Sequence, residues 1–402
     1  MASTIEILKK WNIWDGDIDS GKKRTLYIDK IWPVVDRKEV IVLKGIRRSG
    51  KSTIMKQLMK KLVNSNINKK QILYLNLEDY GFADSLNLEL FDNVLSSYLN
   101  YTKNKKLIYF FIDEIQKIPD WAKWVRTKYE LKDKIKFIVS GSSASLLTKE
   151  LSTLLTGRNL SFLIKPLSYQ EYMKFASSPN IRDYITYGGF PEVVLENNVE
   201  KKIMLLTQYF EDIIHKDIID RYSVRNSKQL LDLTRNIVLN AGTKVSINKL
   251  SKIYGLSTET IATYIGYMVN AFLLIEVTYF SFSELIKYDK SKLPKYYSID
   301  NGFITITNQT YSENRGKKYE NAVLLKLWDG KNNISYWNEL SSEVDFIIDG
   351  KAINVTSTND IPDREQKGLI NFKSKYKNFN LILVSDSIKK DNIIGMHEFL
   401  VT

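Results

Sequence analysis

The feature that most constrains the fold is the run Gly45–Ser52, whose letters GIRRSGKS fit the phosphate-binding loop pattern GxxxxGK[ST]. The apolar segment Val40–Leu43 before it predicts a buried strand, and Thr53–Val63 after it has the apolar spacing of a helix. A strand, a glycine loop and a helix in this order form an anion site, because loop N–H groups and the positive end of the helix dipole face the same point. The alternative is a chance glycine–lysine match in a turn, and the flanking segments argue against it.

The loop residues are expected to bind ATP together with Mg²⁺. Lys51 is expected to reach the β and γ phosphates, and the Ser52 hydroxyl to ligate the magnesium ion. Whether the two arginines of the loop contact nucleotide or a neighbouring subunit stays open. The predicted nucleotide-binding residues are Gly45, Arg47, Arg48, Ser49, Gly50, Lys51, Ser52 and Thr53.

A second predicted strand, Leu107–Ile112, ends in the acid pair Asp113 and Glu114. Open α/β sheets bind ligands at the carboxyl ends of their strands, so these acids should lie near the loop. Asp113 is expected to hold magnesium through water, and Glu114 to polarise the attacking water. An ordinary strand end that happens to carry two acids is the alternative.

Two further residues complete the predicted catalytic set of Glu114, Lys51, Arg158 and Ser140. The strand Lys136–Val139 leads into a serine-rich turn at 140–143, where Ser140 or Ser142 would contact the γ-phosphate or the attacking water. A serine turn that only caps a helix is the alternative. Arg158 follows Thr156 and Gly157 in a loop and is expected to act on the nucleotide of a neighbouring subunit, unless it is an ordinary solvated charge.

Composition narrows the function classes. The chain has no cysteine and only two histidines, which excludes disulfides, thiolate zinc sites and cysteine nucleophiles. Its 59 basic and 46 acidic residues give a net charge of +13, which favours a polyanionic partner, although a generally lysine-rich proteome would give the same excess. No apolar run reaches the roughly 20 residues of a membrane span, and the N-terminus lacks a signal-peptide core, so we expect a cytoplasmic protein without membrane contact.

The apolar runs Val40–Leu43, Ile72–Leu77 and Leu107–Ile112 alternate with helical patterns, which predicts an α/β fold with a parallel sheet at its core. With 402 residues and 44% hydrophobic content, the chain should divide into several domains. Pro166, followed by a capping box at Ser168 and Glu171, predicts the end of the sheet and the start of a helix. The predicted domains are an N-terminal arm (1–36), a P-loop ATPase core (37–172), a helical lid (173–228), a winged-helix domain (229–312) and a nuclease-like domain (313–402).

The segment 246–277 has the pattern of a helix-turn-helix, with helices at Ile247–Ile253 and from Thr258, capped by Ser257, to about Ala271. The second helix should bury Ile261, Ile265, Met268 and Phe272 and expose Glu259, Thr260, Thr263, Tyr264 and Tyr267. Because that exposed face lacks arginine and lysine, specific base reading is not expected. Three roles remain open for this winged helix: packing within the protein, weak contact with a DNA backbone, and reading of DNA.

The C-terminal part predicts a helix at Lys317–Trp328 and strands at 334–337, 344–348, 352–355 and 381–384. Three acids, Glu320, Glu343 and Asp345, fall where a metal-dependent nuclease of the PD-(D/E)xK kind carries its acids. At the positions of the second strand acid and the lysine, this chain has Asn354 and Thr356. Because an amide is a weak magnesium ligand and threonine has no charge, nuclease activity is not expected, and the acids are interpreted as structural.

Taken together, the motifs resemble those of the archaeal and bacterial AAA-type P-loop ATPases that carry a C-terminal restriction-endonuclease-like domain of unknown function. The resemblance implies a nucleotide-binding core, a lid, a winged helix and a nuclease-like tail, and assembly as a homo-oligomer, with a hexameric ring as one candidate. The family commonly has Glu-x-Lys where this chain has Asn354-Val355-Thr356. The matching stretches are 45–52, 111–116, 140–142, 156–158, 166–169, 187–191, 216–218, 294–300 and 343–346.

The sequence leaves three functions open. The first is an oligomeric, Mg²⁺-dependent ATPase that couples ATP hydrolysis to binding or remodelling of DNA, branched or duplex. The second is a regulatory switch, in which ATP orders the lid and displays the C-terminal half to a protein partner without translocation. The third is an active nuclease. DNA is the expected partner because the charge, the helix-turn-helix and the nuclease-like scaffold all favour a phosphate backbone.

Overall fold

The computed structural model describes residues 3–142, 155–283, 291–308, 314–331, 333–388 and 392–402, and the chain divides into two compact units, Met1–Ile164 and Lys165–Thr402. Ser143, the last residue of the predicted serine turn, lies outside the described residues. In the part of the chain that the structure describes, no helix combines the length and the apolar character that a membrane crossing requires.

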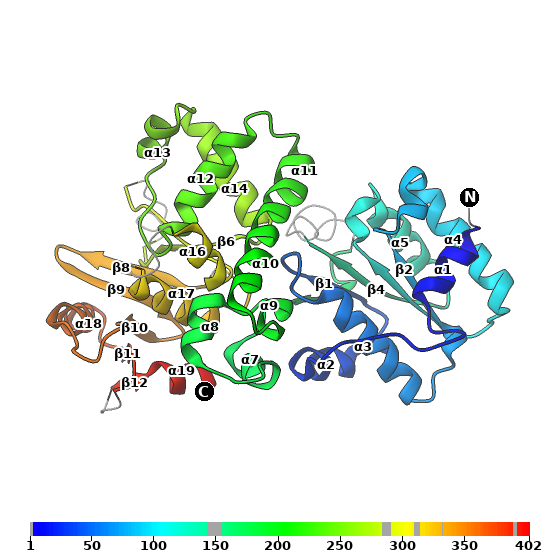
Figure 1. The fold of residues 1–402 in the computed structure, drawn as a ribbon, viewed down its shortest axis with the longest axis horizontal. Helices are drawn as coiled ribbons and strands as arrows, with labels where there is room; N and C mark the ends of the chain where they lie inside the picture. The colour runs from blue at the N-terminus through cyan, green and yellow to red at the C-terminus, as the bar shows by residue number, and fades with distance from the viewer. Residues whose placement is uncertain (1–2, 143–154, 284–290, 309–313, 332, 389–391) are drawn as a thin grey trace. The chain divides into compact units, whose positions relative to one another are not determined.

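The first unit contains a five-stranded parallel sheet in the order β2-β3-β4-β1-β5 (Figure 1). Four of the strands were predicted from their apolar runs, and those runs are buried because helices cover both faces of the sheet. The sequence did not indicate β5, a half-exposed edge strand that carries Asn159 and Ser161. The strands are β1 (Val40–Lys44), β2 (Ile72–Asn76), β3 (Ile108–Asp113), β4 (Ile135–Gly141) and β5 (Asn159–Leu163).

Helices α1, α4 and α5 pack on one face of this sheet, and α2 and α3 pack on the other (Figure 1). Alternate residues of one strand serve the two cores, so Val40 and Val42 join the first and Ile41 and Leu43 join the second. The helices are α1 (Thr4–Trp11), α2 (Thr25–Ile31), α3 (Lys51–Asn64), α4 (Leu88–Thr102) and α5 (Trp121–Glu130), with short 3-10 helices at Trp32–Val34, Lys69–Gln71, Tyr80–Ser85 and Ile115–Lys117.

The first 36 residues, interpreted from the sequence as an arm, pack against the sheet of this unit. The Asn12 side chain exchanges two hydrogen bonds with the backbone of Tyr74 in β2, at 2.7 and 2.8 Å. The Trp14 indole donates to the Ile72 carbonyl at 2.7 Å. Arg24 is buried, with 2% of its surface exposed. These polar contacts attach the segment to β2 in one register, in addition to its apolar packing.

The second unit begins with helices around a glycine-rich turn. The predicted capping box is confirmed, because the Ser168 hydroxyl accepts from the Glu171 N–H and the Glu171 carboxylate accepts from the Ser168 N–H. Although the ATPase core was predicted to extend to residue 172, the chain from Lys165 onward packs with the second unit. The helices are α7 (Tyr169–Phe175), α8 (Ile181–Tyr187), α9 (Pro191–Leu195), α10 (Val199–Asp212), a π-helical stretch (Ile213–Ile219), α11 (Asp220–Tyr222) and α12 (Ser227–Leu239).

A buried carboxylate, Asp300, holds the Gly188–Gly189 turn between α8 and α9. Its oxygens accept from the Gly189 N–H at 2.7 Å and the Gly302 N–H at 2.8 Å. Gly188 has φ +75°, and a Cβ there would lie 1.7 Å from an Asp300 oxygen. The turn therefore requires glycine for both conformation and space.

Asp300 also predicts a pH dependence of stability. Burial raises the pKa of its carboxyl to about 7, although the two backbone N–H groups lower it; an aspartate in an unfolded chain titrates near about 3.9. The contribution of this protonated carboxyl to the free energy of unfolding is therefore fully present below about pH 4, and it is lost as the pH rises toward 7. Between about pH 5 and pH 8, the unfolding free energy of the wild type should fall by about 2–3 kcal/mol relative to that of Asp300→Asn.

Urea denaturation curves at the two pH values measure this difference. The exposed Asp360→Asn variant is the control, and its difference from the wild type should not change with pH in this way. A constant difference for Asp300→Asn would mean that this carboxyl is ionised in the folded protein at both pH values.

The predicted helix-turn-helix is confirmed as α13 (Ile247–Tyr254) and α14 (Thr258–Asn270). Gly255, with φ +64°, ends the first helix, and the Ser257 hydroxyl caps the second by accepting from the Thr260 N–H. The expectation for Tyr264 was wrong: its ring is buried, because it lies one turn after Ile261 on the same helix face. Tyr267 stacks on Tyr222, with ring centroids 3.7 Å apart. The residues predicted to be buried in α14 and after it, Ile261, Ile265, Met268 and Phe272, are buried.

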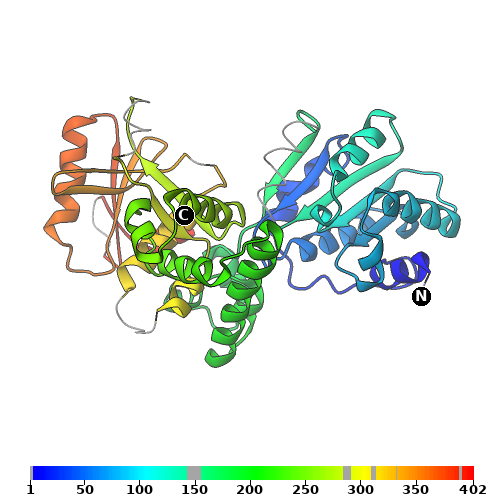
Figure 2. The ribbon, with the colours of Figure 1, turned by 90° about the horizontal axis from the view of Figure 1, so that it is seen from above.

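The second unit has a mixed seven-stranded sheet in the order β12-β11-β10-β9-β8-β6-β7. Because β6 pairs in parallel with β8, the boundary predicted at residues 312 and 313 divides one continuous sheet. Figure 2 shows α18 (Asp363–Lys375), in orange, on one side of this sheet and the green and yellow helices on the other. The strands are β6 (Leu274–Tyr279), β7 (Lys295–Ser298), β8 (Ser335–Glu339), β9 (Ser342–Ile348), β10 (Lys351–Val355), β11 (Asn380–Ser385) and β12 (Ile393–Gly395).

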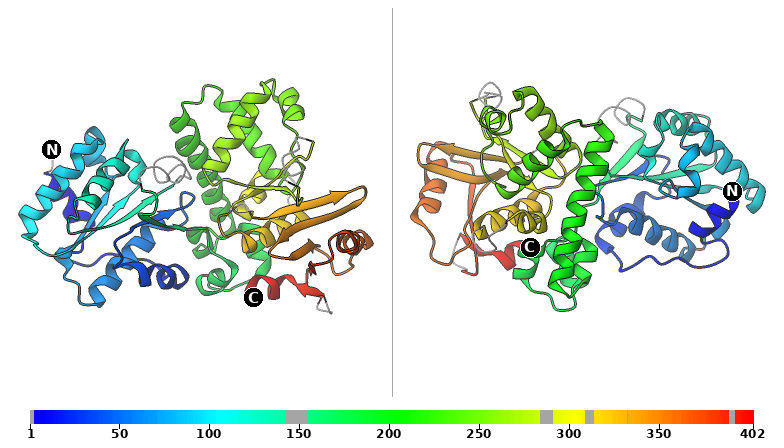
Figure 3. Two further views of the ribbon diagram at one scale, coloured as in Figure 1. Left: turned by 180° about the vertical axis from the view of Figure 1, so that it is seen from behind. Right: turned by 45° about the horizontal axis from the view of Figure 1, so that its top comes forward.

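Among the residues that the structure describes, four helices follow in the chain after β7 and pack with the second unit. The C-terminal helix, red in Figure 3, lies beside α7 at the start of the unit, and the Tyr169 hydroxyl is 2.9 Å from the His397 ring nitrogen Nδ1. The two ends of the second unit are thus held together. The helices are α16 (Asn301–Thr307), α17 (Arg315–Leu327), α18 (Asp363–Lys375) and α19 (Met396–Val401).

Candidate functional site

The predicted phosphate loop connects β1 to α3, and its backbone shape depends on glycine. Gly45 has φ +153°, and a Cβ there would lie 2.0 Å from the Ile164 carbonyl oxygen. Gly50, directly before α3, has φ +93°. Ser52 and Thr53 follow in the first turn of the helix. The loop therefore ends at a helix N-terminus, the geometry that the sequence pattern requires.

Lys51 points back into the loop. Its side chain is 3% exposed, and its ammonium lies 3.9 Å from the Glu114 carboxylate. The ammonium donates to the carbonyls of Gly45 at 3.1 Å and Ile46 at 3.2 Å. The Ser49 hydroxyl is buried and has no hydrogen-bond partner among the described residues. A buried cation and an unsatisfied hydroxyl at the loop fit a nucleotide phosphate with its magnesium ion.

The acid pair lies at the carboxyl end of β3, and β4 separates β3 from β1. This order places Ser140, at the end of β4, between the two predicted motifs. The Ser140 hydroxyl donates to Asp113 and accepts from the Glu114 N–H at 3.2 Å. The second Asp113 oxygen accepts from the Tyr74 hydroxyl at 2.7 Å. Asp113 is therefore oriented from two neighbouring strands, as a residue that must hold one position for magnesium requires.

Glu114 occupies a strained backbone conformation with φ +57°, unusual for a residue with a Cβ. Burial raises the pKa of its carboxyl, Lys51 lowers it, and Asp113 raises it further. Its carboxylate accepts from the Gln116 amide, which also donates to the Ser142 hydroxyl at 3.2 Å. A buried glutamate with a raised pKa, held by an amide, has the properties of a general base.

The sequence motifs did not predict several contacts at this site. Arg24, between α1 and the loop in sequence, donates to the Ser49 carbonyl at 2.7 Å. Arg47 of the loop forms a 2.9 Å ion pair with Glu78, which follows β2. Arg48 has φ +66°, so it adopts the left-handed conformation inside the loop. Contacts of this kind join residues that are distant in sequence, so only the folded chain reveals them.

The structure places Arg158 away from the loop of its own chain. Its carbonyl accepts from the Val40 N–H at 2.8 Å, so it lies where β1 begins, whereas the phosphate loop follows the end of β1. The length of the strand, roughly 16 Å, separates the two ends. The Arg158 guanidinium forms a 3.3 Å ion pair with Glu130. Any contact between Arg158 and nucleotide would therefore involve a second copy of the chain.

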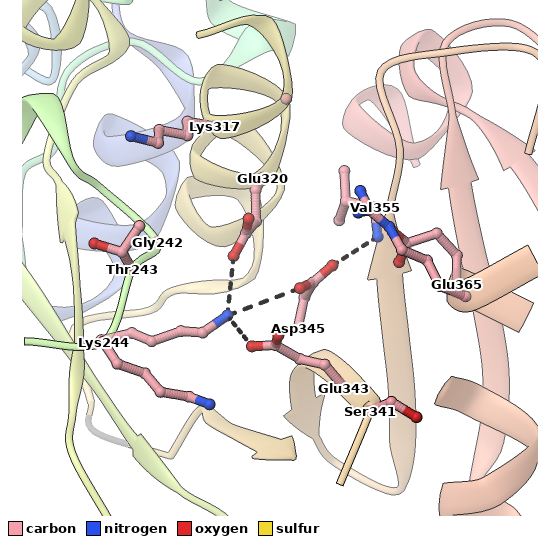
Figure 4. A pocket seen from close by; sticks show the side chains of 13 residues that line it. Gly242, Thr243, Lys244, Lys317, Glu320, Ser341, Glu343, Asp345, Val355 and Glu365 are labelled. Atoms are coloured by element: carbon pink, nitrogen blue, oxygen red, sulfur yellow. Dashed lines mark hydrogen bonds and ion pairs between the residues drawn. The ribbon is translucent and has the colours of Figure 1, made fainter. Parts of the chain in front are cut away.

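A second group of predicted residues meets in the second unit. Glu320 on α17 and Glu343 and Asp345 on β9 converge on the ammonium of Lys295, with oxygens at 3.4, 2.9 and 3.8 Å (Figure 4). They line a pocket of about 550 Å³. The sequence interpretation of these acids as structural did not include Lys295, because Lys295 lies on β7, outside the predicted nuclease-like segment.

The two residues that depart from the nuclease pattern have structural contacts. The Asn354 amide donates to the carbonyls of Glu343 at 3.1 Å and Glu365 at 3.0 Å, and its oxygen accepts from the Asp345 N–H at 3.0 Å. The Thr356 hydroxyl lies 3.1 Å from that of Thr358. Asn354 thus joins β9, β10 and α18, so its polar atoms are already satisfied by backbone groups.

Comparison with known families agrees with the geometry of the first unit. The family described as AAA domain matches residues 37–173, which contain the loop, the acid pair and Ser140. A family described as a domain of unknown function (DUF8612) matches residues 178–312. The S. cerevisiae Hsp104-ADP complex is similar with a TM-score of 0.33 and 13% identity, covering 67% of this chain and 40% of that one, a similarity too low to add to the assignment.

Two relatives align over nearly the whole chain. A Haemophilus influenzae protein, printed as "Uncharacterized protein", is 29% identical over 371 residues, covering 88% of this chain and 91% of its own. The Methanocaldococcus jannaschii "Uncharacterized protein MJ1544" is 30% identical over 380 residues, covering 87% of this chain and 78% of its own. Residues 37–173 match the AAA domain family, in agreement with the P-loop core of the first unit, and the chain belongs to the same family as the Methanocaldococcus protein.

Proposed function

We propose that the protein hydrolyses ATP with Mg²⁺ at the loop of the first unit. The observation that carries this proposal is the convergence of Lys51, Asp113, Glu114 and Ser140 at the carboxyl ends of adjacent strands. Magnesium, when bound, would neutralise charge on the β and γ phosphates. The loop residues from Gly45 to Thr53 would hold the phosphates, and Ser52 and Asp113 would hold the metal ion.

The side chains around this site suggest a division of roles. Glu114 would accept a proton from the attacking water, and its hydrogen bond with Gln116 would keep the carboxylate in place. Lys51 would exchange its carbonyl partners for phosphate oxygens, which attract an ammonium more strongly. Ser140 would sense the γ-phosphate through its contacts with Asp113 and Glu114. Turnover measured with and without Mg²⁺ tests this part of the proposal directly.

We further propose that ATP use is coupled to DNA and that the protein works as a homo-oligomer. The net charge of +13 favours a polyanion. The helix pair α13–α14, followed by the antiparallel strands β6 and β7, has the element order of a winged helix. We propose that the second unit contains a lid, a winged helix and a nuclease-like region. The nuclease-like region is expected to lack nuclease activity.

The test is ATPase turnover measured with single-stranded, duplex and four-way-junction DNA, together with the mass of the complex in solution. Stimulation by several-fold, with DNA affinity that falls steeply as salt rises, would support coupling to DNA. The same samples incubated with supercoiled DNA and Mg²⁺ or Mn²⁺ test for cleavage, and we expect none.

A regulatory switch acting on a protein partner is the second candidate. It is favoured by α14, whose exposed face carries Glu259 and Thr263 and no lysine or arginine. A switch should hydrolyse ATP slowly whether or not DNA is present. Unchanged slow turnover across the whole DNA panel would therefore favour the switch over the DNA-coupled ATPase.

The proposed role of Arg158 in a neighbouring subunit gives a separate prediction. Arg158→Ala should lower turnover by about a thousandfold while nucleotide affinity stays within a few-fold of the wild type, because the guanidinium would stabilise charge that develops only during transfer. Arg126→Ala is the matched control, since Arg126 also forms an exposed ion pair with Glu130. Equal losses of turnover and affinity in Arg158→Ala would remove the assignment.

A further inference from the structure

Arg24 is a buried arginine that contacts the phosphate loop from a segment outside the AAA domain match, which begins at residue 37. The residue is 2% exposed, and its guanidinium donates to the Ser49 carbonyl at 2.7 Å. The guanidinium also lies over the Tyr27 ring, 4.6 Å from the ring centroid. Because burial and the ring restrict the guanidinium, it holds the Ser49 carbonyl in one position.

The backbone around Arg24 is attached to α3, the helix that follows the loop. Gln57, in the second turn of α3, donates to the carbonyls of Ser20 and Lys22, both at 2.9 Å. The Gln57 side chain also accepts from the Arg24 N–H at 3.0 Å. Helix α2, which begins directly after Arg24, lies beside α3 (Figure 1). The arginine therefore reaches the loop from a rigid base.

The contact with Ser49 fixes the direction of one peptide plane of the loop. The Ser49 carbonyl and the Gly50 N–H belong to the same planar peptide group, and the described residues contain no cis peptide bond. The carbonyl and the N–H therefore point in opposite directions, so the N–H points away from Arg24. Within the described residues the Gly50 N–H forms no hydrogen bond, which leaves it available to a ligand.

Gly50 is also the residue at which this peptide can rotate most easily. It has φ +93°, and glycine adopts positive and negative φ at similar cost. A rotated peptide would present its carbonyl oxygen, instead of its N–H, to a bound phosphate. The hydrogen bond from Arg24 opposes this rotation, because bonds from a charged donor are stronger than those between neutral groups.

We propose that Arg24 is a positioning residue of the nucleotide site, which holds the Ser49–Gly50 peptide so that its N–H faces a phosphate of the bound nucleotide. Phosphate loops of this pattern bind phosphates through such backbone N–H groups. The role rests on the proposed function, because it concerns the same loop. It makes the segment before β1 part of the site, although the guanidinium itself need not touch the nucleotide.

The first test is Arg24→Met, which keeps an unbranched side chain and removes the donor. ADP binding should weaken about tenfold or more, the effect of losing one contact to a charged group, and the KM for ATP should rise equally. The kcat should stay within about threefold of the wild type, because the N–H contacts phosphate in the ground state and the transition state alike. Arg24→Lys, which keeps a charged donor, should recover most of the affinity. Calorimetry with ADP and steady-state turnover measure these quantities.

Asn12→Ala is the matched structural control. Asn12 is a buried polar residue of the same N-terminal segment, but it hydrogen-bonds to the Tyr74 backbone and not to the loop. Its replacement should lower the melting temperature and leave the ADP affinity and the KM within about twofold of the wild type, because distant sites act independently. A loss of folded molecules lowers kcat per mole of protein without changing KM. An Arg24→Met protein with that pattern, or with wild-type ADP affinity, would overturn the positioning role.

The wild type offers a second measurement, which does not require any variant to fold. In protein made with isotope-labelled glycine, the Gly50 amide proton resonance should move downfield when ADP binds, because the N–H gains a charged acceptor. ADP binding that leaves this resonance in place would contradict the position assigned to the N–H. A wild type that binds neither ADP nor ATP would instead contradict the proposed function, and the role of Arg24 with it.

Discussion

Replacing Glu114 with glutamine should lower ATP turnover by about a hundredfold to ten-thousandfold, the usual contribution of a general base. Glutamine has the same shape but cannot accept the proton of the attacking water. ATP binding should change little, because the phosphate contacts come from the loop and Lys51. Steady-state turnover and binding of a fluorescent ATP analogue measure the two quantities separately.

Glu89→Gln is the control, since Glu89 is an exposed acid in the first turn of α4. It should retain the turnover of the wild type.

The pH profile of turnover gives a second check. Because burial raises the pKa of Glu114, the base becomes ionised only at a higher pH than an exposed glutamate, and turnover should rise with pH above the ordinary glutamate range. Equal losses of affinity and turnover in Glu114→Gln would contradict a catalytic role.

Replacing Lys51 with methionine should weaken ATP binding by about a hundredfold, because a buried ammonium that contacts phosphate contributes roughly 2–3 kcal/mol. In the present structure the Lys51 ammonium donates hydrogen bonds to the Gly45 and Ile46 carbonyls and lies near the Glu114 carboxylate. Methionine keeps the apolar stem and removes the charge. Calorimetric titration with ATP and Mg²⁺ measures the change.

Lys56→Met is the matched control, a half-buried lysine of the same helix that lies outside the loop. It should bind ATP as the wild type does. A Lys51→Met protein that binds ATP with wild-type affinity would show that the nucleotide site lies elsewhere in the chain.

The helix-turn-helix shows which details local patterns resolve. The capping residues Ser257 and Gly255 and the spacing of Ile261, Ile265 and Met268 were sufficient to predict α14 and most of its buried face. Tyr264 was assigned to the wrong face, because a tyrosine suits both a surface and a core. Its position one turn after Ile261, on the buried face of the helix, was the local signal that indicated burial.

The local sequence alone determined four of the five strands of the first sheet, the glycine loop and the acid pair, because each depends on residues within a few positions of one another. The tertiary structure decided what no local pattern contains: Arg24 on the loop, β4 between the two motifs, and Lys295 among acids from two other elements. The physical reason is that a buried charge or hydrogen-bonding group is satisfied by whatever the fold brings near, and sequence distance does not limit that choice.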